Sequence, residues 1–332
     1  MPKRLWIPAA RPVCIAGAVL CVLYTGCTPS PVEITPRPAE IGTPRRSFTV
    51  VSYNIQARPL LDDCGWKSPL IGERLRPFDL AGLQESFCGY QQLFEQNGLH
   101  SGARFGRRRH LLKPTNSGLA VLSRFPITGA VAEYFEDEGS LENRAASKGV
   151  LLARIELNRQ KLDVYTTHLA AGTPAVSGEA RRNQLKQFAV FIQRNSPPDH
   201  AVIACGDFNL QPASPELAEF LEQAGLRSST LELGFSGWPP IDHIFYRPSA
   251  ALPLRPVLRQ LLKKEFTIEG HGPLSDHAPL LVEFQLAPPA EPGADQPRPT
   301  RSPVAVFSGL RRAAATTAGR HSASANREGL RR

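Results

Sequence analysis

The chain has 332 residues and a formal net charge of +9, but that charge belongs to its two ends. Residues 1–46 carry six Lys/Arg against two acids, residues 288–332 carry eight Arg against three acids, and the 25 basic and 25 acidic residues of 47–287 cancel. This balance excludes a body-wide basic field of the kind that binds nucleic acid, although a local basic patch stays open.

The N-terminus has the pattern of an export signal. Three basic residues precede an apolar run over 13–24, which is too short to span a bilayer as a helix. The run ends in Leu23-Tyr24-Thr25-Gly26-Cys27, which resembles the lipobox of bacterial lipoproteins, although Tyr24 departs from the usual aliphatic residue. We predict a lipoprotein-type signal peptide over 1–27 and an exported chain that a lipid on Cys27 anchors in the bacterial cell envelope. A plain cleaved signal, which would give a periplasmic or secreted protein, and an uncleaved anchor are the alternatives.

Residues 28–46 are rich in proline and have no apolar periodicity, which predicts a semi-rigid linker. The body, residues 47–287, alternates apolar runs with turn residues. Predicted strands span 48–53, 79–84, 118–123, 149–155, 162–167, 201–205, 241–246 and 279–284. Helical spacing predicts helices over 179–193 and 215–224, a helical segment around 73–75, and a short helix within 252–264 that either lies on a membrane surface or packs with a solvated face.

Several predicted strands are continuous apolar runs, which are typical of strands covered on both faces. The body is therefore expected to form two packed sheets with helices outside. Residues 288–332 are rich in Pro, Ala, Ser and Arg and have few large apolar residues, so a disordered basic tail is expected there.

Three cysteines lie within the body. Cys205 stands in an apolar run and is expected to be an inert core thiol. Cys64 and Cys88 form a disulfide if the compartment is oxidising, or else stay apart, and the sequence leaves both alternatives open.

Polar residues of a few types follow or flank the predicted strands. These residues are Asn54, Glu85, His168, Asp207, Asn209, Asp242, Asp276 and His277. If the strands align, their ends converge on one edge of the sandwich, which is an ordinary place for a site. Carboxylate, amide and imidazole groups without cysteine favour Mg²⁺, with Mn²⁺ or Ca²⁺ as alternatives, over zinc.

The same residues lie in short motifs that occur in one order along the chain. These motifs are Ser52-Tyr-Asn54, Leu83-Gln-Glu85, Thr167-His168, Gly206-Asp-Phe-Asn209, Ile241-Asp242 and Ser275-Asp-His277. Their order resembles that of the endonuclease/exonuclease/phosphatase superfamily over about residues 47–287. The resemblance implies an α/β fold, a four-layered α/β sandwich of two packed mixed β-sheets flanked by helices. It also implies metal-dependent cleavage of a phosphate ester.

The resemblance also implies a role for each matched residue. Asn54, Glu85 and Asp276 would hold the metal. His277 would take a proton from the attacking water, and Asp242 would orient its ring. Asp207 and Asn209 would orient the nucleophile and the phosphate, and His168 would stabilise charge in the transition state. His243 and His271 are expected to be structural.

Further segments resemble the neutral and bacterial sphingomyelinase branch, among them 116–127, the Lys148-Gly149 pair and the Arg/Asn-Gln helix around 181–185. The sequence between 241 and 275 contains no long aromatic hairpin of the kind that secreted bacterial sphingomyelinases insert into lipid. A sphingomyelinase-like phospholipase C that acts on a lipid head group is the first hypothesis for function, because the neutral body lacks the surplus of Lys and Arg that gives a non-specific nuclease its phosphate affinity. A DNase-type phosphodiesterase that uses the basic loop 107–110 is the second, and a non-catalytic binding domain is the third. No protein partner is predicted, and a monomer is expected.

Overall fold

The computed structural model describes residues 32–38, 44–109, 113–141, 143–237 and 239–286. The predicted signal peptide 1–27 and the predicted tail 288–332 lie outside these residues, as do parts of the predicted linker. No helix among the described residues is long and apolar enough to cross a membrane.

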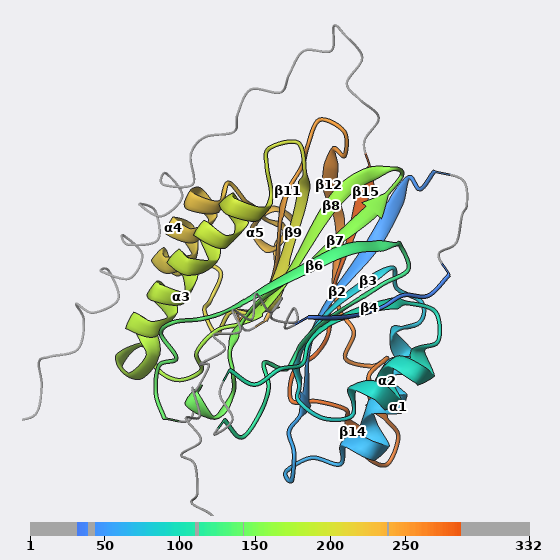
Figure 1. Cartoon of the computed structure of the whole chain (residues 1–332), viewed down its shortest axis with the longest axis vertical. Helices are drawn as coiled ribbons and strands as arrows, with labels where there is room; N and C mark the ends of the chain where they lie inside the picture. The colour runs from blue at the N-terminus through green and yellow to red at the C-terminus, as the bar shows by residue number, and fades with distance from the viewer. Residues whose placement is uncertain (1–31, 39–43, 110–112, 142, 238, 287–332) are drawn as a thin grey trace, which may run out of the picture. The chain divides into compact units, whose positions relative to one another are not determined.

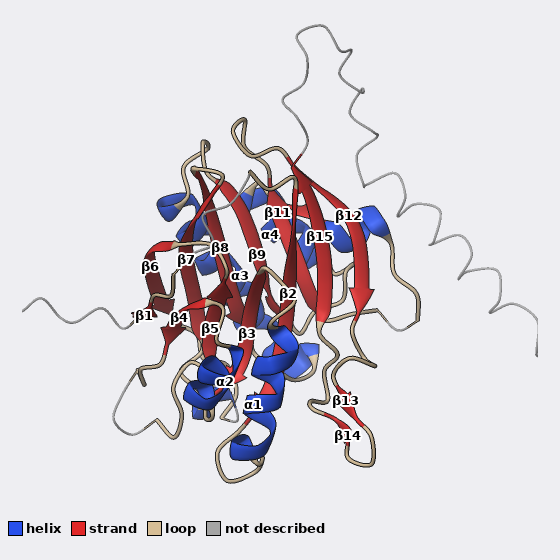
Figure 2. Ribbon diagram, turned by 90° about the vertical axis from the view of Figure 1, so that its right-hand side faces the viewer, coloured by secondary structure: helices blue, strands red, loops and turns tan. Residues whose placement is uncertain are grey.

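Two large sheets form the body (Figures 1 and 2). The seven-stranded sheet has the order β1 (Glu33–Thr35), β4 (Ser101–Phe105), β5 (Leu119–Ser123), β3 (Leu80–Ser86), β2 (Ser47–Ala57), β15 (Leu280–Leu286) and β12 (Leu254–Leu261). The six-stranded sheet has the order β10 (Arg227–Ser228), β11 (Asp242–Arg247), β9 (Ala201–Asp207), β8 (Gln160–His168), β7 (Gly149–Leu157) and β6 (Ile127–Tyr134). A small hairpin pairs β13 (Thr267–Ile268) with β14 (Gly272–Pro273).

Helices cover the outer face of each sheet. Helices α3 (Pro174–Asn195) and α4 (Pro215–Ala224) pack on the six-stranded sheet, and α1 (Cys64–Leu75) and α2 (Tyr90–Asn97) pack on the seven-stranded sheet (Figure 1). The short helices α5 (Ser229–Leu233) and η1 (Asn143–Ala145) lie in connections. The predicted fold class, two mixed sheets flanked by helices, is confirmed.

Strand alternation explains the three apolar cores of this arrangement. On β2, Val50 faces the core between the two sheets, whereas Val51 faces the core beneath α1 and α2. On β7, Leu151 faces the core between the sheets and Leu152 faces the core beneath α3 and α4. Because both faces are buried, the strands are the continuous apolar runs that the sequence displays.

The segment 252–264 is a correction, because neither helical interpretation of it holds. Leu254–Leu261 is the edge strand β12, which pairs antiparallel with β15 and carries a register shift between Pro256 and Leu258. Buried Leu254 and Pro256 alternate with exposed Arg255, which is the two-residue period of a strand and not the period of a helix. Proline is tolerated because the strand lies at the sheet edge.

The predicted linker is also more structured than expected, because residues 33–35 form β1 and pair with β4 in register Glu33↔Arg104. The predicted body strands are all present, and the predicted helices other than the one within 252–264 correspond to α1, α3 and α4. The sequence analysis did not identify α2, β4 or β6.

The two parallel pairs in the sheets, β2 with β3 and β8 with β9, place four carboxyl ends together. Asn54 near the end of β2 contacts Asp207 at the end of β9 across the two sheets. We call the edge of the body at which β2, β3, β8 and β9 end the site edge.

Candidate active site

His277 and Asp242 meet at the site edge, where strands of different sheets begin. Asp242 is the first residue of β11, opposite Asp207 in register, and His277 lies in the loop before β15. The Nδ1 atom of His277 is 2.8 Å from Oδ2 of Asp242. With Nδ1–H as the donor, the second ring nitrogen, Nε2, faces Oδ2 of Asp207 at 3.6 Å.

The electrostatics of this pair follow from burial and charge. Burial lowers the pKa of His277, but the hydrogen bond and charge of Asp242, together with the charges of Asp207 and Asp276, outweigh it and raise the pKa to about 9. In the metal-free protein the ring is therefore an imidazolium at neutral pH.

Asp207 is the most connected of the predicted residues. Its Oδ2 accepts a hydrogen bond of 3.1 Å from Asn54 Nδ2 and lies 3.5 Å from Nε2 of His168. Its Oδ1 accepts a 3.0 Å bond from the backbone N–H of Asn209. Burial, followed by the charge of Asp242, raises the pKa of Asp207. The carboxylate is thus held where further positive charge would stabilise its ionised form.

Glycine makes the strand end at Asp207 possible. Gly206 has φ 153°, and a Cβ atom there would stand 2.1 Å from the carbonyl oxygen of Thr167. A side chain at this position would push β9 away from β8, which would move Asp207 away from His168.

Glu85 offers a carboxylate oxygen that is free to bind a cation. Its Oε1 accepts a 3.1 Å hydrogen bond from Asn54 Nδ2, while its Oε2 is buried and has no hydrogen-bond partner. The backbone of Glu85 has φ 51°, a left-handed conformation that costs a non-glycine residue about 1–3 kcal/mol and is found preferentially at functional sites. An unpartnered buried carboxylate oxygen beside other oxygen donors fits a hard divalent cation.

Asp276 lies at the same site through a residue that the sequence analysis missed. Gln56 donates from Nε2 to Oδ2 of Asp276 at 2.8 Å, and its Oε1 accepts a 3.2 Å bond from the backbone N–H of Asp276. Gln56 also has a left-handed φ of 50°, and the ammonium of buried Lys67 donates to its backbone carbonyl. The position of Gln56 two residues after Asn54 was the available signal, but no motif marked it.

Buried Lys148 is the second residue without a predicted role. Its Nζ donates to the backbone carbonyl of Leu169 at 2.6 Å. Burial lowers the pKa of Lys148 to about 8, and the charges of Asp207 and Glu85 oppose that shift. Burial, followed by the positive charges of Lys148 and His277, holds the pKa of His168 well below its usual value. His168 is therefore neutral at pH 7.

The predicted residues thus divide into three sets. One set is in mutual contact and comprises Asn54, Glu85, His168, Asp207, Asp242 and His277. Asp276 is held by Gln56 rather than by another predicted residue. The amide of Asn209 points to the carbonyl of Leu169, at 3.3 Å, so only its backbone reaches Asp207.

One group of possible metal-ligating atoms differs from the predicted metal set. Asp207, Asp242 and His277 offer ligand atoms that lie within 4.8 Å of one another. In the predicted set, the nitrogen of the Asn54 amide faces Glu85, whereas its Oδ1 accepts from the backbone N–H of Gln56 at 3.1 Å. The Asn54 amide links the two sets, because its Nδ2 also donates to Oδ2 of Asp207 at 3.1 Å.

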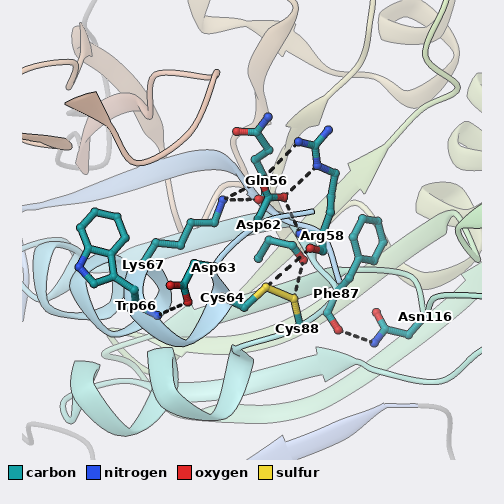
Figure 3. Close-up of a disulfide and its surroundings, with 11 residues drawn as sticks. Gln56, Arg58, Asp62, Asp63, Cys64, Trp66, Lys67, Phe87, Cys88 and Asn116 are labelled. Carbon is teal, nitrogen blue, oxygen red and sulfur yellow. Dashed lines mark hydrogen bonds and ion pairs between the residues drawn. A yellow bond between two sulfur atoms is a disulfide. The ribbon is translucent and has the colours of Figure 1, made fainter. Parts of the chain in front are cut away.

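The structure pairs Cys64 with Cys88 in a disulfide, which was one of the two open alternatives (Figure 3). The bridge joins the first residue of α1 to Cys88, which lies two residues after the end of β3 and donates from its backbone N–H to the carbonyl of Ala57 at 3.2 Å. Cys205 is a buried free thiol, and burial raises its pKa to about 12, which agrees with an inert core residue.

The two histidines expected to be structural make structural contacts. His243 is fully buried, stacks on Phe245 and has Nε2 2.8 Å from the carbonyl of Leu210. His271 stands on the β13–β14 hairpin and stacks on Trp66 of α1 with ring centroids 5.3 Å apart.

Residues 51–277 match the endonuclease/exonuclease/phosphatase family, which is well over half of the chain. The chain belongs to this family. Sphingomyelinases of Mycobacterium bovis and Mycobacterium tuberculosis are 26% identical over 262 residues, which cover 71% of this chain and 52% of each relative. The chain thus spans about half the length of these relatives. The resemblance to the sphingomyelinase-like branch is confirmed by these matches.

Solved structures share the fold at lower identity. A beta toxin variant of Staphylococcus aureus with bound magnesium ions has a TM-score of 0.54 and 17% identity, covering 73% of this chain and 100% of that chain. TDP2 of D. rerio, complexed with a single strand DNA product, has a TM-score of 0.56 and 19% identity, covering 73% of this chain and 100% of that chain. At these identities the likeness concerns the fold alone.

Proposed function

We propose that this chain is an exported metal-dependent phosphodiesterase that hydrolyses a phosphate ester by in-line attack of water, and that it acts on lipid as a sphingomyelinase-like phospholipase C. The observation that carries the proposal is the His277–Asp242 pair, in which Nε2 of His277 faces Asp207. The Asn54 amide joins Asp207 to Glu85, whose Oε2 has no hydrogen-bond partner. The proposed base (His277), the carboxylate that orients it (Asp242) and a cation ligand (Glu85) are thus joined through the contacts of Asp207 and Asn54.

The proton transfer follows from the hydrogen bonds of the pair. Asp242 accepts from Nδ1–H of His277, which fixes the tautomer. With a cation bound, the carboxylate charges that raise the pKa of the ring would be offset, so that Nε2 would lose its proton and could take one from water. The carboxylate of Asp207, 3.6 Å from that nitrogen, would orient the water and stabilise the imidazolium that forms. Neutral His168, 3.5 Å from the same carboxylate, would donate to a phosphoryl oxygen as charge develops there.

Mg²⁺ is the cation proposed for the site, and Glu85, Asn54 and Asp276 would hold it, with Mn²⁺ or Ca²⁺ as alternatives. When bound, it would neutralise charge on the phosphoryl oxygens and stabilise the leaving oxygen. The unpartnered oxygen of Glu85 and the acceptor-rich surroundings support this proposal.

A lipid head group is favoured over nucleic acid for two reasons. Relatives that match this chain over 262 residues are sphingomyelinases, and residues 47–287 lack the net positive charge that non-specific DNA binding requires. In the basic loop, Arg109 lies 3.6 Å from Glu138 and also donates to the carbonyl of Phe135, so part of its charge is compensated within the fold. We further propose that the chain is a monomer, divided as predicted from the sequence, and that lipid on Cys27 anchors it in the cell envelope.

The test uses the full chain with Mg²⁺ and either sphingomyelin vesicles or plasmid DNA. Phosphocholine release with intact plasmid is the expected result, and it should fall at least about a hundredfold in H277A. The matched control H271A changes an exposed histidine on the β13–β14 hairpin and should keep the parent rate. Plasmid nicking without phosphocholine release would replace the lipid substrate with nucleic acid. Inertness on both substrates without Mg²⁺ binding would favour a non-catalytic domain.

A further inference from the structure

The most exposed large apolar side chains of the described residues gather at the site edge. Relative exposures are 104% for Leu60, 82% for Leu141, 74% for Leu61 and 62% for Val176. Leu60 and Leu61 lie between β2 and α1, and Leu141 lies between β6 and β7. Val176 is in the first turn of α3, which follows β8.

Strand register places these three segments at one edge. Gly149 of β7 pairs with Tyr134 of β6, and Val150 pairs with Thr167 of β8, so the β6–β7 connection lies where β8 reaches His168. The loop between β2 and α1 begins just after Ala57 and extends below the strands in the view of Figure 1. Exposed apolar side chains therefore lie on three segments at the edge that carries the candidate active site.

The loop that carries the two leucines is fixed by polar contacts. Arg58 donates from Nε and from its backbone N–H to Oδ2 of Asp62, both at 2.9 Å (Figure 3). The backbone N–H of Asp62 donates back to the carbonyl of Arg58 at 3.1 Å. These bonds close a tight loop, and its tip residue Leu60 has a left-handed φ of 67°.

The base of the same loop is fixed as well. The backbone N–H of Cys64 donates to the carbonyl of Asp62 at 2.9 Å, and the disulfide joins Cys64 to Cys88. A loop held this way cannot readily fold its tip onto the body, so Leu60 and Leu61 are presented to the surroundings. Two neighbouring leucines exposed to water are unfavourable, and their transfer into an apolar medium would lower the free energy.

We propose that the site edge docks on a phospholipid bilayer, with Leu60 and Leu61 inserted among the lipid chains and Leu141 and Val176 at the interface. The choice of a bilayer rests on the proposed function, because a diester within a lipid head group reaches the site only if this edge faces the membrane. The described residues contain no long aromatic hairpin. The β2–α1 loop would therefore be the segment that inserts into the lipid.

The test measures lipid contact without requiring hydrolysis. Full-length L60W and V190W chains are mixed with sphingomyelin–phosphatidylcholine vesicles that contain brominated lipid, in EDTA so that no metal-dependent turnover occurs. Val190 is a matched control because it is 57% exposed but lies near the distant end of α3. After subtraction of the parent's fluorescence, the tryptophan at position 60 should be quenched and blue-shifted, and the one at position 190 should not.

The second measurement is co-sedimentation of L60S/L61S and V190S with the same vesicles. The double variant should bind at least about tenfold more weakly than V190S, because two inserted side chains are lost. The N-terminal apolar run is common to all variants, and thermal unfolding verifies that each variant is folded. Equal quenching at positions 60 and 190 would overturn the proposal, as would unchanged binding of the folded double variant. A dimer in the parent that L60S/L61S converts to a monomer would also overturn it, in favour of a contact between two copies. Because both readouts need no turnover, an inactive but vesicle-docked parent would overturn the proposed function alone.

Discussion

The Nδ1 atom of His277 lies 2.8 Å from Oδ2 of Asp242, although the strands that these two residues precede or begin belong to different sheets. The histidine precedes β15 of the seven-stranded sheet, and the aspartate begins β11 of the six-stranded sheet. Their contact therefore exists only when the two sheets pack face to face. The packing of the apolar core thus sets which ring nitrogen of His277 is available as a base.

Replacing Asp242 with asparagine should change both the titration and the rate. D242N removes the charge that holds the pKa of His277 at about 9, so the pKa should fall by on the order of 1–3 units. NMR titration of the ring in the metal-free protein measures this shift. Phosphodiester hydrolysis should fall roughly a hundredfold or more, because the tautomer is no longer fixed.

The matched control for this change is E232Q, since Glu232 accepts a 2.8 Å hydrogen bond from Tyr246 away from the site edge. Its histidine titration should equal that of the parent. An unchanged His277 titration in D242N would mean that the pair does not form in solution.

Replacing Gln56 should weaken Mg²⁺ binding and leave the rate of the chemical step nearly unchanged. Q56G removes both hydrogen bonds to Asp276 and keeps the backbone compatible with φ 50°, since glycine adopts that conformation without strain. The Mg²⁺ concentration for half-maximal activity should rise about 10–100-fold, as is usual when a group that orients a metal ligand is lost. The rate at saturating Mg²⁺ should stay near that of the parent.

A metal titration of activity, supported by calorimetry of Mg²⁺ binding, measures this effect. Q91A is the control, because exposed Gln91 on α2 donates to Glu95 at 2.9 Å, one turn along the same helix. A lower rate at saturating Mg²⁺ with unchanged half-saturation would show that Asp276 is not among the metal ligands.

The sequence was sufficient for the parts of the fold and site that depend on local pattern. Runs such as 48–53 and 201–205 are β-prone and long enough to define strands, and polar residues directly after them fall at a common edge by topology. The error at 252–264 arose because leucines three or four residues apart suit a helical face as well as an edge strand. Only the pairing of β12 with β15 decides between the two.

Contacts between distant segments explain what the sequence could not supply. Gln56 is an ordinary polar residue until the loop before β15 brings Asp276 within 2.8 Å of it. The same holds for Lys148, whose ammonium reaches Leu169 only after β7 and β8 have paired. The choice between paired and free Cys64 also depended on proximity in space, because the spacing of the two cysteines was compatible with both states.

The disulfide should stabilise the fold through the unfolded chain. Its sequence separation of 24 residues predicts that C64S/C88S lowers the free energy of unfolding by about 3 kcal/mol, because the open chain gains loop entropy. Urea unfolding measures the loss. Alkylation with peptide mapping supplies the control: Cys64 and Cys88 should react only after reduction, and buried Cys205 should not react in the folded chain. Alkylation of Cys64 without reductant would contradict the pairing.

Buried His243 should make the fold sensitive to acid. Burial lowers the pKa of His243 from 6.5 to about 4, and the hydrogen bond from Nε2 to the carbonyl of Leu210 opposes this shift only in part. The buried Nδ1 has no hydrogen-bond partner for a second proton. The unfolded chain therefore binds a proton more readily than the folded chain, and stability falls as pH drops from 6.5 to about 4. A shift of this size corresponds to roughly 3 kcal/mol. At pH 7, H243F should have a lower free energy of unfolding than the parent, because the carbonyl of Leu210 loses its hydrogen-bond donor. Since phenylalanine does not titrate, this difference in unfolding free energy should shrink by roughly 3 kcal/mol as the pH falls from 6.5 to about 4. Urea unfolding of the metal-free proteins at successive pH values measures the difference, and parallel curves for parent and variant would assign the acid sensitivity to other groups.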